Sequence, residues 1–167
     1  LTDRLTVEAE QFIEQNKERP FFLYLSYYSV HTPLQAPRER VAKYEKKPKG
    51  ERHKNSTYAA MVESVDCSVG RVMARLEKLG LAKNTVVIFT SDNGGHGRIT
   101  SHQPLRGNKG NFYEGGIRVP LIVKWPGVVK PASTCNVPVI STDYYPTLLA
   151  MTGQPARPRQ HVDGRNL

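Results

Sequence analysis

Cysteine and long apolar runs are both scarce in this 167-residue sequence. The two cysteines, Cys67 and Cys135, have a separation that fits neither a zinc motif nor a disulfide framework, and the helical pattern around Cys67 predicts that it lies in the core. No apolar run approaches the roughly 18 residues of a membrane-spanning helix, and Leu1 opens a polar stretch without a secretory signal. We therefore expect a globular polypeptide and, since no Met begins it, a fragment.

Acidic residues are also few, and basic residues outnumber them. Asp and Glu number 15 against 24 Lys and Arg, which gives a net charge of +9, and residues 38–54 hold eight of the basic residues against three Glu. Such a balance is compatible with nucleic acid, with an anionic substrate or with a solvated face. Aromatic side chains that could stack on bases are not interleaved with these charges, which disfavours single-stranded nucleic acid. We expect 38–54 to be a basic loop insertion.

Hydrophobic spacing predicts an alternation of helices and strands. Apolar residues recur at spacings of three and four in residues 5–13 and, at greater length, in 58–79, which Gly80 follows. Continuous apolar runs predict buried strands. The predicted strands are 21–26, 85–90 and 119–124, a short helix is predicted at 143–151, and 154–167 is expected to be an irregular tail.

The order strand, long helix, strand predicts parallel neighbours joined by a right-handed crossover, which is the unit of an α/β fold. His31 follows the first of these strands and Asp92 follows the second. Ligands of open α/β sheets bind beyond the carboxyl ends of the strands, so we expect chemistry at this edge.

Asp92 and Asn93 place a carboxylate and an amide carbonyl side by side, and such hard oxygens suit Ca²⁺ or Mg²⁺. The same residues also open an Asn-Gly sequence that is typical of a tight turn, and two oxygens are too few for a calcium shell. His31 can act as an acid, as a hydrogen-bond donor to an anion, or as an ordinary loop histidine.

Residues 105–116 are rich in glycine around Lys109. Glycine lets the backbone approach a ligand closely, and an ammonium group is a compact partner for sulfate or phosphate oxygens. The spacing does not match a nucleotide phosphate loop, and a merely flexible loop is the alternative.

Together these segments resemble the sulfatase family, in the family's own order and over nearly the whole chain. The motifs that carry the resemblance are SVHTP at 29–33, YAAMVESVD at 58–66, FTSDNG at 89–94, GNKG at 107–110, YEGGIRVP at 113–120, WPG at 125–127 and DYYPTL at 143–148.

The resemblance implies a sulfuric ester hydrolase built on part of an alkaline-phosphatase-like α/β sandwich, with a mostly parallel sheet flanked by helices. It implies a bound Ca²⁺, with Mg²⁺ as the alternative, and a formylglycine nucleophile. By the same resemblance Asp92 and Asn93 are metal ligands, while His31 and Lys109 contact the sulfate group. Residues 114–116 and Arg118 also match the family pattern, and we interpret them as shaping the loop.

One family feature is missing. The Cys/Ser-x-Pro-x-Arg motif that yields formylglycine occurs nowhere in the sequence, and neither do the acidic ligands expected before it. We therefore expect residues 1–167 to be one partial catalytic domain that is inactive by itself.

The expected partner is a sulfated small molecule or glycan, with no nucleic acid and no membrane; the substrate, compartment and oligomeric state stay open. A phosphatase or phosphonate hydrolase of the same superfamily is the rival enzyme, although His rather than Asn93 would be expected beside its strand-end Asp. A non-catalytic module that binds sulfated glycans is the rival outside enzymes.

Overall fold

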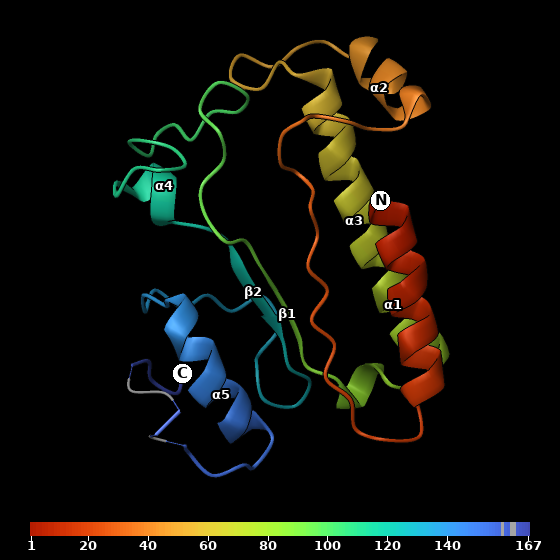
Figure 1. Ribbon diagram of the computed structural model, residues 1–167, viewed down its shortest axis with the longest axis vertical. Coiled ribbons are helices and arrows are strands. Elements are labelled where there is room, and N and C mark those ends of the chain that lie inside the picture. The colour runs from red at the N-terminus through yellow and green to blue at the C-terminus, as the bar shows by residue number, and fades with distance from the viewer. Residues whose placement is uncertain (158, 161–162) are drawn as a thin grey trace. The chain divides into compact units, whose positions relative to one another are not determined.

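The structure is a computed structural model that describes residues 1–157, 159–160 and 163–167 (Figure 1). The chain divides into two compact units, Leu1–Lys130 and Pro131–Leu167. Each is described by itself below, and the expectation of one domain across 1–167 stays a prediction. No helix within the described residues has the apolar stretch that crossing a lipid bilayer requires.

Two long helices that pack side by side and run in the same direction form the core of the first unit. Helix α1 (Thr2–Asn16) lies along α3 (Ser56–Lys78), as Figure 1 shows. Both were predicted from their apolar spacing, and the prediction is confirmed. Asn55 caps α3 by accepting a hydrogen bond from the Tyr58 amide, and Gly80 follows the helix with φ of 72°. The buried apolar side chains of the unit are Ala9, Ile13, Ala60, Met61 and Leu76.

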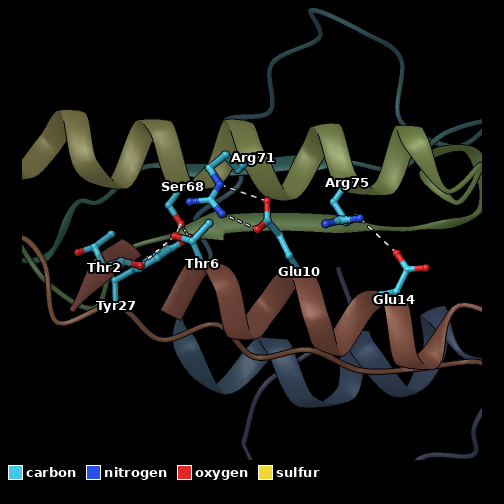
Figure 2. A network of polar contacts seen from close by, with 8 residues as sticks. All are labelled: Thr2, Thr6, Glu10, Glu14, Tyr27, Ser68, Arg71 and Arg75. Carbon is cyan, nitrogen blue, oxygen red and sulfur yellow. Dashed lines mark hydrogen bonds and ion pairs between the residues drawn. The ribbon is translucent and has the colours of Figure 1, made fainter. Parts of the chain in front are cut away.

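A polar seam joins the same two helices (Figure 2). The hydroxyl of Ser68 on α3 lies 2.5 Å from that of Thr6 on α1 and 2.7 Å from that of Tyr27. Burial raises the pKa of the Tyr27 phenol, and the hydrogen bond with Ser68 opposes that rise. Further along, Arg71 forms a bidentate ion pair with Glu10. The seam therefore fixes the register of α1 against α3 and attaches Tyr27 to both.

The sheet differs from the expectation. After the 3₁₀ turn η1 (Ala82–Asn84), strand β1 (Val87–Thr90) pairs antiparallel with β2 (Leu121–Lys124), so that Phe89 lies opposite Ile122. Residues 21–28 are extended, but within the described residues they are not paired as a strand. The parallel pairing that we expected between the first two strand segments is therefore not formed here. A crossover connection can place two strands in the same sheet with other strands between them. The two connected strands therefore need not be hydrogen-bonded to each other.

Two local expectations also need correction. Residues 38–54 begin with a helix, α2 (Arg38–Glu45), which packs on α3, where we expected a loop. Cys67 is exposed, not in the core, and neither cysteine is paired. Cys67 precedes the buried Ser68 by one residue, which corresponds to about 100° around the helix axis. The Cys67 side chain therefore lies on the face of α3 that α1 does not cover.

The second unit contains the predicted short helix. The 3₁₀ turn η2 (Ser141–Asp143) leads into α5 (Tyr144–Met151), and Gly153 ends the helix with φ of 66°. Asp143 accepts hydrogen bonds from the amides of Ile140 and Arg165, at 2.9 Å and 2.8 Å. These two backbone donors hold the pKa of the Asp143 carboxyl below its usual value. The described residues after 153 contain no helix or strand.

Candidate functional site

The loop that carries His31 is held by both long helices. Tyr27 reaches Ser68 on α3, and the Ser29 hydroxyl lies 2.9 Å from that of Thr2 on α1. The His31 amide then donates to the carbonyl of Tyr28 at 3.1 Å, which closes the turn. The His31 side chain itself is exposed to solvent, while these hydrogen bonds hold the backbone that carries it.

His31 and Lys109 are in direct contact, although 78 positions separate them in the sequence. The Nζ atom of Lys109 lies 2.9 Å from Nε2 of His31, and Nδ1 of His31 lies 2.7 Å from the carbonyl oxygen of Thr32. Because a carbonyl oxygen only accepts, Nδ1 carries the imidazole proton, and Nε2 accepts from the Lys109 ammonium. The orientation of the imidazole ring is therefore fixed from both sides.

The loop that carries Lys109 folds back on the loop after β1. The Lys109 amide donates to the carbonyl of Gly95 at 3.0 Å, and the Gly94 amide donates to that of Gly116 at 2.8 Å. A Cβ at Gly94 would lie 2.0 Å from the carbonyl oxygen of Gly115, so only glycine allows this approach. Gly115 and Gly116 are buried in the short helix α4 (Glu114–Ile117), which the sequence pattern did not predict.

Asp92 and Asn93 follow β1 after a single residue, Ser91. The Asn93 amide donates to the Asp92 carboxylate at 2.5 Å, and the Asp92 side chain is exposed. Their hard oxygens suit Ca²⁺ or Mg²⁺, but they make up only part of a shell of six to eight ligands. Within the described residues, no group of three or more His, Cys, Asp or Glu is placed to hold a metal ion. The pair therefore fits a metal as two of its ligands and no more.

The structure thus connects the four predicted site residues in two ways. His31 and Lys109 touch directly, whereas the loop of Asp92 and Asn93 reaches Lys109 through the backbone at Gly95. Among the described hydrogen bonds and ion pairs, none joins Asp92 or Asn93 to the side chains of the other two.

His102 has a role that sequence reasoning did not identify. Its Nε2 accepts a hydrogen bond from the Gly95 amide at 2.7 Å, on the residue whose carbonyl holds Lys109. Apart from the nearness of His102 to the glycine-rich segment, no sequence pattern indicates this contact, because it joins two irregular loops.

Comparison with known proteins identifies the family of this chain. The family model described as Sulfatase matches residues 1–154. Human steryl-sulfatase is 39% identical over 176 residues and a sulfatase of Formosa agariphila is 41% identical over 181 residues. Each alignment covers 100% of this chain but only 29% and 33% of those proteins.

A solved structure is similar over the same length. The crystal structure of Ps i-CgsB in complex with k-i-k-neocarrahexaose superimposes with a TM-score of 0.89 at 41% identity, over 99% of this chain and 37% of the other. The likeness supports the α/β class and the alkaline-phosphatase-like architecture expected from the sequence. By its sequence, its fold and the order of its loops, this chain belongs to the sulfatase family.

Proposed function

We propose that this chain forms part of an enzyme that hydrolyses sulfate esters, with His31 and Lys109 at the reacting group. The contact between Lys109 and His31 carries the proposal. An ammonium group and an imidazole held together at an exposed loop edge are suited to bind a tetrahedral anion and to move a proton beside it.

The two residues have separate tasks. One N–H of the Lys109 ammonium is directed to His31, and its two other N–H groups are available by their chemistry for sulfate oxygens. There they offset the negative charge that develops on the sulfuryl oxygens in the transition state. His31 is oriented by Thr32, and its Nε2, which accepts from the Lys109 ammonium, can relay one ammonium proton to the oxygen of the leaving alcohol as the S–O bond breaks.

Asp92 and Asn93 would hold Ca²⁺, or Mg²⁺, together with ligands from outside this pair. A bound divalent cation polarises the ester. The sequence supplies no residue for a formylglycine nucleophile, since neither Cys67 nor Cys135 is followed two places later by proline. The chain spans about a third of the relatives it matches, so we assign the nucleophile to a part of the complete protein that this sequence does not include.

The test is the substrate preference of the complete protein. We expect it to hydrolyse p-nitrophenyl sulfate in preference to p-nitrophenyl phosphate and phenyl phosphonates, and to lose that activity in Lys109→Ala. The matched control is Lys83→Ala, which removes an exposed lysine of η1 outside the site. A preference for phosphate or phosphonate would favour the rival enzyme, and tight binding of sulfated sugars without turnover would favour a binding module.

A further inference from the structure

A wide cleft lies beside the site already described. Its volume is about 820 Å³, within the range of pockets that hold small molecules. One wall is the end of the basic segment, residues 52–55, and the other is the loop of residues 97–108.

Specific contacts hold the two walls together. Arg52 donates through Nη1 to the carbonyl oxygen of Gln103 at 3.1 Å, across 51 positions of sequence. Nδ1 of His53 lies 3.0 Å from the Thr100 hydroxyl. The cleft is therefore a defined feature of the fold rather than a gap between unconnected loops.

The charge of the cleft has one sign. Its lining includes the cations Arg52, Lys54, Arg98 and Arg106 and no Asp or Glu among the described residues. Arg106 is positioned by the Tyr113 ring, whose centroid lies 3.8 Å from the guanidinium carbon.

The other end of the basic segment is different, because it is neutralised. There Arg40 pairs with Asp3 at 3.8 Å and Lys43 pairs with Glu63. These two ion pairs join α2 to α1 and to α3, whereas none of the described ion pairs involves Arg52 or Lys54 of the cleft.

The cleft shares a loop with the proposed site. Its lining includes Asn108, the residue before Lys109, and His102, whose Nε2 accepts from the Gly95 amide. A ligand with one anionic group at Lys109 and a second group between the basic walls would follow this loop.

We propose that this cleft is a subsite for a second anionic group of the substrate, and that the substrate is therefore a glycan that carries several sulfate or carboxylate groups. The proposal rests on the proposed sulfatase function. Guanidinium groups bind such oxyanions in a bidentate manner, and an open, polar cleft suits a hydrated sugar chain. A steroid sulfate would need an apolar cavity, whereas Ile99 and Leu105 are the large apolar side chains among the lining residues.

The experiment compares two substrates in the complete protein. The first is p-nitrophenyl sulfate, which has one anionic group, and the second is k-i-k-neocarrahexaose, a sulfated oligosaccharide. The test variant is Lys54→Ala/Arg98→Ala, because both side chains are exposed and their loss should not disturb folding. The control is Lys83→Ala/Lys124→Ala, which removes the same charge from exposed positions outside the cleft.

We expect the test variant to raise KM for the oligosaccharide about tenfold or more, as for lost hydrogen bonds to charged groups. Its kcat/KM for p-nitrophenyl sulfate should stay within about twofold of wild type, since that substrate does not reach the cleft. The control should leave both values unchanged. Lys54→Arg/Arg98→Lys, which keeps the charges, should restore most of the affinity.

Several results would overturn the subsite while leaving the sulfatase function intact. They are an unchanged KM for the oligosaccharide, an equal loss on both substrates, and a lower KM for estrone sulfate than for the oligosaccharide. Binding of an oligothymidylate as tight as that of the oligosaccharide, and lost in the same variant, would instead assign the cleft to nucleic acid.

Absence of hydrolysis of every sulfate ester would overturn the proposed function and not the subsite. In that case calorimetric titration with k-i-k-neocarrahexaose decides the subsite alone. Binding that is lost in Lys54→Ala/Arg98→Ala and kept in the control supports it, and equal binding by all variants contradicts it.

Discussion

Lys109 donates a hydrogen bond to Nε2 of His31, whose other ring nitrogen is held by the carbonyl of Thr32. In the complete protein we expect His31→Ala and Lys109→Ala each to lower turnover of an aryl sulfate by about 10²-fold or more, the usual order for a lost transition-state contact. Steady-state kinetics and thermal melting should be measured on the same preparations. A wild-type rate with unchanged melting in either variant would remove that residue from the mechanism.

The metal pair gives a second prediction. The isolated 167-residue chain should bind Ca²⁺ weakly or not at all, because Asp92 and Asn93 supply only part of the oxygen shell. Calorimetry with wild type and Asp92→Ala checks this. Micromolar binding that the substitution abolishes would mean that the site is complete without further acidic ligands.

The third prediction is that the isolated chain has no sulfatase activity. A covalent mechanism needs its nucleophile, and no Cys or Ser here lies in the motif that is converted to formylglycine. Hydrolysis of a chromogenic aryl sulfate should appear only in a longer protein that includes that motif. Activity that survives repurification of the isolated chain and disappears in Lys109→Ala would contradict the prediction.

Ser68 gives a prediction on stability. Ser68→Val removes the hydroxyl that both Thr6 and Tyr27 contact, and it leaves their buried oxygens without that partner. Such a loss costs about 1–3 kcal/mol in the free energy of unfolding. Urea unfolding at low protein concentration measures it, with Cys67→Val at the neighbouring exposed position as the control. Equal free energies of unfolding for the two variants would show that the hydrogen bonds of the Ser68 hydroxyl contribute little to stability.

The lowered pKa of Asp143 predicts that the stability of the second unit depends on pH. Its pKa is lower in the folded state than in the unfolded chain, so its contribution to stability is present above the unfolded value and is lost as pH falls through the folded one. Below about pH 4 the protection of the Arg165 amide against hydrogen exchange, relative to the intrinsic rate at the same pH, should therefore fall. Asp143→Asn should weaken this attachment at neutral pH and remove its pH dependence, which amide exchange of both proteins would reveal.

The long helices could be predicted from sequence because each has one apolar face. The spacing of Ala9 and Ile13 in α1, and of Ala60, Met61 and Leu76 in α3, is the spacing of a buried helical stripe. Strand pairing was not predictable in the same way. The runs at 85–90 and 119–124 indicate strands, but nothing within them says that Phe89 lies opposite Ile122 in an antiparallel pair.

The site was predictable to the extent that it lies in recognisable motifs. The sheet-edge argument singled out His31 and Asp92, and the glycine-rich segment with the family resemblance added Lys109, which the structure shows in contact with His31. The basic cleft had no such signal. Its walls are joined by contacts such as the hydrogen bond from the Arg52 side chain to the Gln103 carbonyl. Both residues lie in irregular segments, which show no repeating spacing of apolar residues from which such a contact could be predicted.

The extended residues 21–28 also govern how the isolated chain behaves in concentrated solution. Phe22 and Tyr24 are 69% and 81% exposed, and within the described residues no strand pairs with this backbone. An unpaired, aromatic, extended segment is a template for association between copies, which the net charge of +9 opposes by mutual repulsion. At physiological ionic strength that repulsion is screened beyond about 8 Å. Added salt should therefore precipitate the isolated chain rather than dissolve it.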